Sequence, residues 1–492
     1  MINYRINGDF YGNARSVIKG SEGFRGDIYS DTVSIPTIGY GYALIVRQRK
    51  SNGTMNYVVA DYVQNEFASI GIAPTPAQMN LLRDIAIDLT NGNTAAARTK
   101  TATLDAQIRD IDQAEASTLF NRSLDRALAD VKRGFIASLG SANGELLFTE
   151  MTGSTELVAI SSMAFSGGSD IVGRSLSQAL WNSNRAEAWY EIRYNSNNGS
   201  SRSPGIAKRR YYESELFGIY NNSASVQVDE AKEVFRMFSL HRSDIERYEQ
   251  RYGVDFDGNA GWDRINGRPP LGAANYEFNL SGAAAVDAIH DALSPAWTAL
   301  FAELQRLYPT GMAGLSATDF SPVNVQLDPN RNAGQPVTTN TQDHQSYLDG
   351  RRFNSQGQEI STRDVLIGEG GRDTLRGGLG DDVLIGGEGD DIYIYRAGDG
   401  NDRIIDSDRR GRVIVFDANG QHRELAAGAF FQQNPNGGTI WQSADGQISI
   451  THNSPWRLVL SDGSTIELGD FQDGDFGIDL INAPVPVDYT RT

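Results

Sequence analysis

Three residues near the start of the chain have types and spacings that suit hydrolysis. Glu22 is followed nine residues later by Asp31, and Thr37 comes six residues after Asp31. A protonated carboxyl can donate a proton to a leaving oxygen, while a second, ionised carboxylate acts as base or stabiliser on the other face. A nearby hydroxyl can hold the attacking water. This division of roles is the one that glycoside hydrolysis requires.

The segments around the two acids are predicted to give them unlike environments. Apolar positions at helical spacing predict a short helix over residues 13–22 that ends at Gly23. Glu22 then lies in the last turn, where the helix dipole disfavours an ionised carboxylate. Asp31 lies in a polar turn between two predicted strands, where water and backbone N–H groups favour its ionised form. We therefore expect Glu22 to be the general acid, with Asp31 and Thr37 positioning and activating water.

A second group of residues has the spacing of a metal site. Asp364, Asp373, Asp382 and Asp391 recur every nine residues, and each is followed two places later by Leu or Tyr. The glycines between them permit tight turns, and carboxylate and backbone carbonyl oxygens are the ligands that Ca²⁺ prefers. The pattern resembles the nonapeptide repeat of RTX proteins, which implies a β-roll in which two nonapeptides complete one coil. Asp364 should then stack with Asp382 and Asp373 with Asp391. We expect each pair to hold a calcium ion.

The repeat pattern is regular at its centre and irregular at its ends. Glu369 stands where the second glycine of the first unit belongs, and Asp402 follows Asp391 after a step of 11 residues. We therefore expect the units at 377–394 to bind calcium well and the outer sites to be weaker. The predicted calcium ligands are Asp364, Gly368, Gly371, Asp373, Gly377, Gly380, Asp382, Gly386, Gly389, Asp391 and Asp402.

Composition narrows the classes of protein. The chain has 492 residues, 39% of them hydrophobic, which is enough for about two to four domains. Cysteine is absent, which excludes disulfides, thiolate metal sites and cysteine nucleophiles. The net charge is −18, and 26 acidic side chains oppose 14 basic ones over residues 323–492, so nucleic acid is not an expected partner. Neither a membrane-inserting apolar run nor an N-terminal signal peptide is recognised.

Changes in composition along the chain predict a multidomain fold. We expect an α+β domain at its N-terminus, a helical middle region, and an all-β C-terminal part built from a parallel β-roll with flanking strands. Within the middle region, Ser294 and Pro295 are predicted to begin a helix. The predicted divisions are residues 1–222 for the first domain, 223–322 for a helical region of unknown role, 323–350 for a linker, 351–406 for the β-roll, and 407–492 for a β-rich flanking and secretion-signal region.

The stretch at residues 19–44 resembles the active-site segment of phage-type lysozymes, the muramidases of glycoside hydrolase family 24. That family has a Glu, an Asp nine residues later, and a Thr six further inside a "TIGYGH"-like strand, and Glu22, Asp31 and Thr37 match it. The family's usual His is Tyr42 here. Three further segments resemble the family's later helices and loops, at residues 111–131, 159–180 and 205–217. The last contains Arg209 and Arg210, which we expect to be packing or surface residues.

The resemblance to the lysozyme family covers about residues 10–220, and the excess length over a minimal member is expected as insertions near 46–105 and 133–155. A separate resemblance covers residues 359–406, which are similar to the GGxGxDxUx repeat of RTX proteins. Residues 464–485 also resemble the C-terminal region of RTX proteins exported by type I secretion.

Together the two resemblances imply a secreted, calcium-dependent muramidase that cleaves the β-1,4 bond between N-acetylmuramic acid and N-acetylglucosamine in peptidoglycan. The family implies inversion at the anomeric carbon, and an antibacterial or wall-remodelling role. The expected partners of this protein are peptidoglycan, calcium and a type I secretion apparatus. Two alternatives stay open, namely a phage lysis or virion-associated lysin, and a calcium-stabilised adhesion or peptidoglycan-binding protein with an inactive lysozyme fold.

Overall fold

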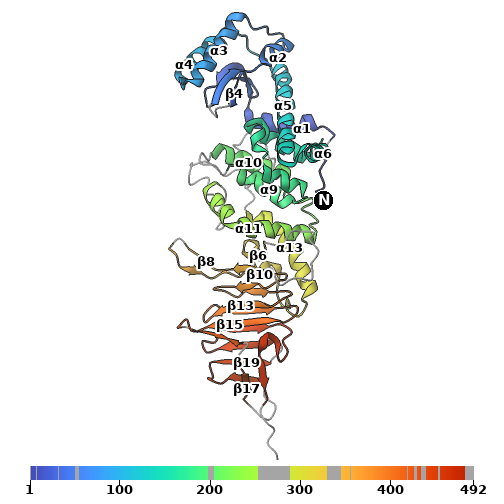
Figure 1. The fold of residues 1–492 in the computed structure, drawn as a ribbon, viewed down its shortest axis with the longest axis vertical. Coiled ribbons are helices and arrows are strands. Elements are labelled where there is room, and N and C mark those ends of the chain that lie inside the picture. The colour runs from blue at the N-terminus through green and yellow to red at the C-terminus, as the bar shows by residue number, and fades with distance from the viewer. Residues whose placement is uncertain are drawn as a thin grey trace, which may run out of the picture. The chain divides into compact units, whose positions relative to one another are not determined.

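The computed structural model describes residues 2–6, 8–31, 33–49, 55–197, 204–252, 289–329, 345–354, 356–417, 419–425, 429–433, 439–452 and 455–482. The chain divides into two compact units. Of the described residues, 2–221 belong to the first unit, and 222–252 and 289–482 belong to the second. The protein is multidomain, with helices in its N-terminal half and a large mixed sheet in its C-terminal region (Figure 1).

The first unit contains a small sheet and many helices. β1, β2 and β3 form an antiparallel sheet, and β4 and β5 form a separate hairpin. The elements are α1 (Phe10–Glu22), β1 (Arg25–Ser30), β2 (Pro36–Gly39), β3 (Tyr42–Ala43), β4 (Ile45–Arg49), β5 (Met55–Val59), α2 (Val63–Ser69), α3 (Pro76–Thr90), α4 (Thr94–Asp105), α5 (Gln113–Leu139), α6 (Ser141–Met151), α7 (Thr155–Gly167), α8 (Arg174–Trp181), α9 (Arg185–Arg193) and α10 (Pro204–Phe217).

The predicted end of the first helix agrees with the structure. α1 ends at Glu22, and Gly23 follows with a φ of 70°. Glycine takes this left-handed conformation without the steric cost that a side chain adds, so it ends helices readily. Tyr29 of β1 pairs with Thr37 of β2, and the turn between the two strands contains Asp31.

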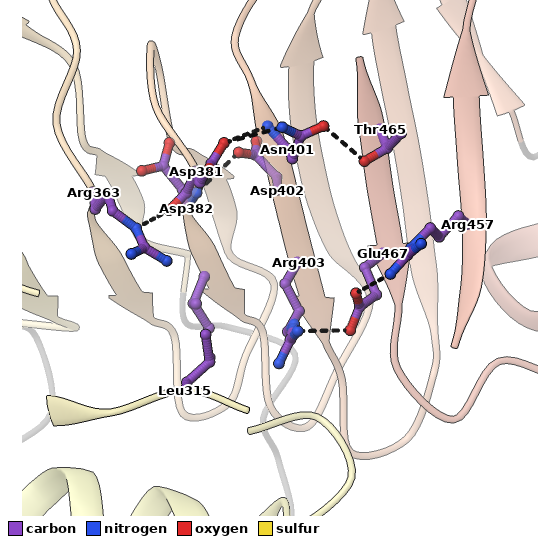
Figure 2. Close-up of a pocket in the computed structure, with 11 residues that line it drawn as sticks. Leu315, Arg363, Asp381, Asp382, Asn401, Asp402, Arg403, Arg457, Thr465 and Glu467 are labelled. Carbon is purple, nitrogen blue, oxygen red and sulfur yellow. Dashed lines mark hydrogen bonds and ion pairs between the residues drawn. The ribbon is translucent and has the colours of Figure 1, made fainter. Parts of the chain in front are cut away.

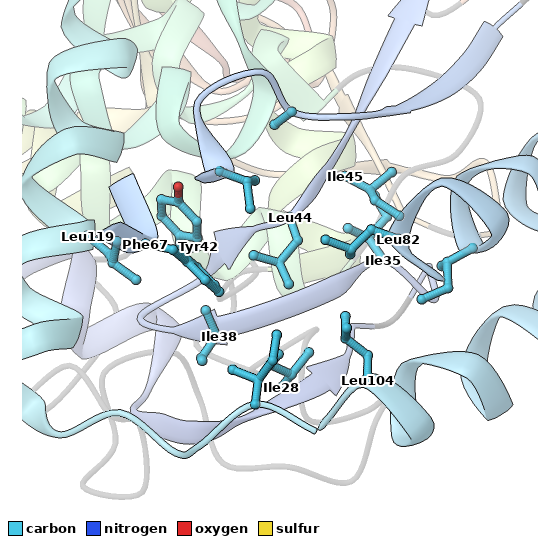
Figure 3. Packing of buried hydrophobic residues seen from close by; sticks show 14 of the residues in the cluster. Ile28, Ile35, Ile38, Tyr42, Leu44, Ile45, Phe67, Leu82, Leu104 and Leu119 are labelled. Carbon is cyan, nitrogen blue, oxygen red and sulfur yellow. The ribbon is translucent and has the colours of Figure 1, made fainter. Parts of the chain in front are cut away.

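One hydrophobic core joins the small sheet to the helices that follow it. Ile28, Ile38 and Tyr42 from the sheet pack with Phe67 of α2 and Leu82 of α3, as Figure 3 shows. The segment 46–105, expected as an insertion, therefore shares the core of the sheet. Its hairpin and helices bury the face of the sheet that carries these three side chains.

α5 connects this core to the helix that carries Glu22. The helix begins at a capping box, because the Asp112 carboxylate accepts from the N–H of Glu115 while the Glu115 side chain accepts from that of Asp112. Its residue Leu119 packs in the core of the sheet. One position later, Phe120 packs with Ala14 and Ile18 of α1 in a second cluster. α5 thus supports both α1 and the sheet.

The second unit combines two helices with stacked β-coils. Its described elements are α11 (Val228–Tyr252), α13 (Ile289–Leu307), β6 (Val325–Leu327), β7 (Tyr347–Asp349), β8 (Arg352–Phe353), β9 (Glu359–Ile360), β10 (Val365–Ile367), β11 (Thr374–Arg376), β12 (Val383–Ile385), β13 (Asp391–Arg396), β14 (Asn401–Ile405), β15 (Gly411–Phe416), β16 (His422–Glu424), β17 (Ala429–Gln432), β18 (Ile440–Ser443), β19 (Ile448–His452), β20 (Trp456–Leu460), β21 (Thr465–Leu468) and β22 (Asp479–Ile481).

The unit contains two sheets, in which the short strands of the coils pair in parallel and most of the strands after β15 pair antiparallel. One sheet has the order β22-β17-β18-β19-β20-β21-β14-β12-β10-β6, and the other has the order β16-β15-β13-β11-β7. Figure 1 shows the strands of this unit stacked from β6 to β17. Leu366, Leu375, Leu384 and Tyr393, the apolar residues of the nonapeptides, are buried between the sheets. The same core continues into the antiparallel strands after β15, through side chains such as Ile450.

The predicted linker at 323–350 differs from the structure at both of its ends. Val325 of β6 pairs with Val365 of β10, and Tyr347 of β7 pairs with Thr374 of β11, both in parallel. These strands add one coil before the first nonapeptide. Each is only three residues long and polar in part, so its sequence alone gives no strand signal. The middle of the predicted linker, residues 330–344, lies outside the described residues.

The helical middle region, predicted as a separate part, belongs to the same unit as the roll. α11 packs on α13 and on β6, and the Ser239 hydroxyl of α11 accepts a hydrogen bond from the backbone N–H of Leu327 at 3.0 Å. Trp297 and Phe301 of α13 are buried. The predicted helix start at Ser294 is wrong, because α13 begins at Ile289 and contains Pro295 in its interior.

Candidate functional site

The repeat aspartates stack in two rows along the roll. Val365 pairs with Val383 in one sheet and Thr374 with Ile392 in the other, which sets each aspartate next to the one 18 residues later. The backbone N–H of Asp364 donates to Oδ1 of Asp382 at 2.8 Å. The N–H of Asp373 donates to Oδ1 of Asp391 at the same distance. One carboxylate oxygen of each later aspartate is therefore fixed by the preceding coil.

Asp402 joins the first row despite the irregular spacing before it. Val383 pairs with Arg403, a step of 20 residues, so the two extra residues extend the turn and leave the register intact. The N–H of Asp382 consequently donates to Oδ1 of Asp402 at 3.1 Å. The last coil thus repeats the bond found between the earlier coils.

The other carboxylate oxygen of these aspartates is buried without a hydrogen-bond donor. Oδ2 of Asp382, Asp391 and Asp402 has no partner in the described part of the chain, and all three side chains are at most 2% exposed. Burial raises the pKa of Asp391 to about 6, and it raises the pKa of Asp382 and Asp402 as well. Buried, unpaired carboxylate oxygens are costly. A bound cation would offset this cost and keep the groups ionised.

Glycines at the turns leave room for the carboxylates against the backbone. A Cβ at Gly377 would lie 2.1 Å from Oδ2 of Asp382, and one at Gly386 would lie 2.3 Å from Oδ2 of Asp391. At Gly368 it would meet Oδ2 of Asp373 at 2.5 Å. A side chain at these positions would fill the cradle, so glycine is required there.

The remaining predicted glycines allow adjacent coils to approach closely. A Cβ at Gly389 would lie 1.6 Å from the carbonyl oxygen of Gly371, and one at Gly380 would lie 1.7 Å from that of Thr362. At Gly368 a Cβ would meet the carbonyl oxygen of Gly386 at 2.7 Å as well as the Asp373 carboxylate, so a backbone carbonyl stands beside a carboxylate at this turn. No three His, Asp or Glu side chains converge as a metal cage within the described ranges, so these carbonyls must supply much of any coordination shell. The donor set fits Ca²⁺, a hard cation with flexible geometry.

Residues 361–393 match the family model of the RTX calcium-binding nonapeptide repeat, in four copies. This segment is an RTX repeat region. The RTX repeats bind calcium, as the spacing of the aspartates predicts, and such repeats are typical of secreted proteins. No curated protein matches the chain. In the described part of the chain, no helix has the length and apolar character needed to cross a membrane.

A pocket gives access to the first row of the RTX repeats. It encloses about 440 Å³ and is bordered by Asp382 and Asp402, with Asp381 and Asn401 beside them (Figure 2). The Asp381 carboxylate accepts from the backbone N–H of Asn401 at 2.9 Å, which orders this edge. The pocket offers calcium a path from solvent to buried carboxylates.

Three aspartates near the last coil were not predicted from the sequence. Asp399 is 3% exposed, and burial raises its pKa to about 6. The Tyr393 hydroxyl donates to Oδ2 of Asp406 at 2.6 Å, and Asp408 accepts from the N–H of Gly389 at 2.9 Å. They depart from the nonapeptide period, and the only sequence signal for them is the density of Asp after the last regular unit.

The irregular first repeat has a structural explanation. Glu369 has a φ of 66°, the left-handed conformation that Gly378 and Gly387 hold in the next two units. Its carboxylate forms ion pairs with Lys232 and Arg236 of α11. Glu369 therefore joins the first repeat to the helix.

Of the three candidate catalytic residues, Glu22 is at the C-terminal end of α1, and its side chain lies outside the described residues. Asp31 is held in a tight turn, where its Oδ1 accepts from the N–H groups of Val33 at 2.9 Å and Ile35 at 2.7 Å. Neither bond occupies Oδ2. The Arg98 side chain donates to the hydroxyl of Ser34 at 2.9 Å and so fixes this turn to α4.

The surroundings of Asp31 combine the predicted backbone donors with partial burial. The predicted N–H donors are present and favour the carboxylate, but partial burial outweighs them and raises the pKa of Asp31 above its usual value. Thr37 is 4% exposed, and its hydroxyl donates to the carbonyl oxygen of Ile35 at 3.1 Å. Because a hydroxyl has one hydrogen, further contacts of Thr37 use its oxygen as an acceptor.

Two other positions noted in the sequence are structural. The Tyr42 hydroxyl donates to Glu66 at 2.8 Å, and Arg126 pairs with the same carboxylate at 2.6 Å. Tyr42 thus takes part in an interhelical polar network at the position where the lysozyme family has His. Arg209 and Arg210 both form ion pairs with the buried carboxylate of Glu213, which makes them packing residues as expected.

Proposed function

We propose that the first unit is a peptidoglycan hydrolase of the muramidase type and that the RTX region folds with calcium after export. The observation that carries the proposal is the Asp31 turn. Two backbone N–H groups hold one carboxylate oxygen there, and Thr37 stands on the next strand with its hydroxyl hydrogen already committed to Ile35. Glu22 precedes this hairpin at the end of a helix.

In the proposed reaction Glu22 protonates the leaving oxygen of the glycosidic bond. Asp31 accepts a proton from the attacking water through its Oδ2, and Thr37 accepts a hydrogen bond from the same water. The upward pKa shift of Asp31 makes it a stronger base than an exposed aspartate. Inversion follows if the two carboxyls stand about 6.5–9.5 Å apart, because water then fits between the base and the sugar.

The test is turnover of purified peptidoglycan by the full chain. Glu22→Gln should lower the release of reducing ends by about 10²–10⁴-fold, the usual contribution of general acid catalysis, while binding to walls persists. Glu150→Gln, an exposed residue of α6, is the matched control and should act like the wild type. Near-normal lysis by Glu22→Gln would refute the assignment. Wall binding without turnover by the wild type would favour the adhesion alternative.

The export proposal rests on the RTX repeats and on the resemblance of residues 464–485 to the C-terminal region of type I secretion substrates. The acidic coils after Asp364 should stay unfolded at low calcium because their carboxylates repel one another. Millimolar calcium outside the cell would then stabilise the folded roll by mass action. Secretion from cells with and without the type I apparatus tests this route. Equal export by both would contradict it.

A further inference from the structure

The first coil of the roll extends the Asp364 row by one position. Val325 of β6 pairs with Val365 of β10, so Asn324 stands one coil before Asp364. The row therefore reads Asn324, Asp364, Asp382 and Asp402. We call each pair of neighbouring residues in this row a step. The Asn324–Asp364 step has the same register as the later steps, in which both residues are aspartates.

The guanidinium of an arginine lies close to both residues of this first step. Nη2 of Arg352, on β8, donates to the carbonyl oxygen of Val323 at 2.7 Å and to Oδ1 of Asn324 at 2.9 Å. The same nitrogen lies 4.0 Å from Oδ1 of Asp364. A backbone carbonyl, an amide oxygen and a carboxylate are the classes of oxygen that Ca²⁺ takes as ligands in proteins. Here they surround a guanidinium.

The guanidinium is held in place from α11. Nη1 of Arg352 lies 3.1 Å from Oε1 of Glu246, and Arg242 pairs with the same oxygen at 2.9 Å. Arg242 also donates to the carbonyl oxygen of Val323 at 2.6 Å. The Arg352 side chain is 17% exposed, so little of it is left to water. Its position is therefore determined by several contacts at once.

The later aspartates differ from Asp364 in this respect. All four aspartates have a buried oxygen without a hydrogen-bond donor, and that of Asp364 is the oxygen beside Arg352. Within the described residues, Asp382, Asp391 and Asp402 form no ion pair with Lys or Arg. An external cation can be accommodated at these positions. At the Asn324–Asp364 step the chain already supplies positive charge.

We propose that the Asn324–Asp364 step is a cation position of the roll that Arg352 occupies in place of calcium. The first coil, built from β6 and β10, then holds together without the ion. The later coils, built around β12 and β14, require calcium. The calcium-bound region of the roll therefore begins after Asp364.

Hydrogen exchange of the full chain, followed by mass spectrometry, tests this. In chelator, amides of β6 and β10 should exchange at least about tenfold more slowly than those of β12 and β14, since local opening free energies differ between parts of one protein. Calcium should remove most of this difference. Equal exchange of all four strands in chelator would overturn the proposal.

Arg352→Gln removes the charge and should abolish the protection of β6 and β10 in chelator, with calcium restoring it. Arg351→Gln is the matched control, because Arg351 is adjacent in sequence and pairs with Asp349 instead. Protection unchanged in Arg352→Gln would refute the role of the guanidinium. If that variant fails to fold even in calcium, the calcium titration of the wild type decides the matter. Protection of β6 and β10 must then precede that of β12 and β14, and a common midpoint would overturn the proposal.

Discussion

The carboxylate of Glu369 in the first nonapeptide lies 2.8 Å from the ammonium of Lys232 in α11. Arg236, one turn further along the helix, pairs with the same carboxylate. A residue other than glycine at a φ of 66° carries a cost of about 1–2 kcal/mol. The ion pairs offset this cost, and the first repeat gains an anchor that the glycines of the later repeats do not provide.

The first prediction follows from this balance. Glu369→Gly should relieve the backbone strain but leave two cations of α11 without their partner. Hydrogen bonds to charged groups contribute about 1.5–3 kcal/mol each, so we expect a net loss of about 1–3 kcal/mol in the free energy of unfolding. Urea unfolding at saturating calcium measures it. Glu388 is an exposed acid two repeats later, and Glu388→Gln should change the free energy of unfolding by less than about 0.5 kcal/mol. A more stable Glu369→Gly protein would show that strain dominates.

A second prediction concerns calcium affinity. Asp391→Asn removes the charge of a buried carboxylate in the second row, and we expect the calcium concentration at half-maximal folding to rise at least about tenfold. Asp390→Asn changes the same charge one residue earlier, at an exposed position, and should have little effect. The measurement is circular dichroism of the full chain during calcium titration. Equal midpoints for the two variants would remove Asp391 from the ligand set.

The third prediction is an opposite pH dependence with and without calcium. Burial raises the pKa of Asp391 to about 6. Because the folded state then binds protons more tightly than the unfolded state, this group stabilises the metal-free roll fully below about pH 3.8, and this stabilisation is lost as the pH rises through 6. Calcium needs the ionised carboxylates, so its affinity should rise over the same range.

Exchange rates of the roll at pH 5.5 and 8, corrected for intrinsic chemistry, measure both trends. We expect the metal-free roll to be more protected at the lower pH and the calcium dissociation constant to be smaller at the higher pH. A metal-free roll that gains stability as the pH rises would contradict the sign of the shifts. That result would mean that the buried carboxylates are paired in solution.

A fourth prediction separates a positioning role of Thr37 from a structural one. If its oxygen accepts a hydrogen bond from the attacking water, Thr37→Val should lower kcat and leave wall binding nearly unchanged, since the missing bond matters chiefly in the transition state. Thr37→Ser keeps the hydroxyl and should recover most of the rate. A parallel loss of binding and thermal stability in Thr37→Val, not recovered by Ser, would assign the hydroxyl to the Ile35 contact alone.

The repeat could be predicted from the sequence because every coil has Asp and apolar residues at the same positions. Each Asp fixes a turn and each Leu or Tyr fixes the inward face, so the register of Asp364 on Asp382 follows from the period. The end of α1 at Gly23 followed in the same way from a local steric rule.

The first coil could not be predicted because its strands depend on distant partners. Val325 and Tyr347 form strands through pairing with β10 and β11, and neither short segment has a period of its own. The start of α13 was missed for a related reason. Ser294 has the chemistry of an N-cap, but its hydroxyl donates back to the carbonyl of His290 inside a helix that tertiary packing extends. The turn aspartates Asp399 and Asp406 were missed because they lie outside the nine-residue period.

The hydrogen bond from Leu327 to the Ser239 hydroxyl has a consequence for self-association. β6 is the outermost strand of its sheet, and an outermost strand offers unpaired N–H and C=O groups to any other extended chain. α11 covers this strand, and Ser239 accepts the hydrogen bond of one of its N–H groups. At this edge a helix lies where a strand of a second molecule would otherwise pair, so α11 protects the β6 edge of the roll against strand-to-strand association.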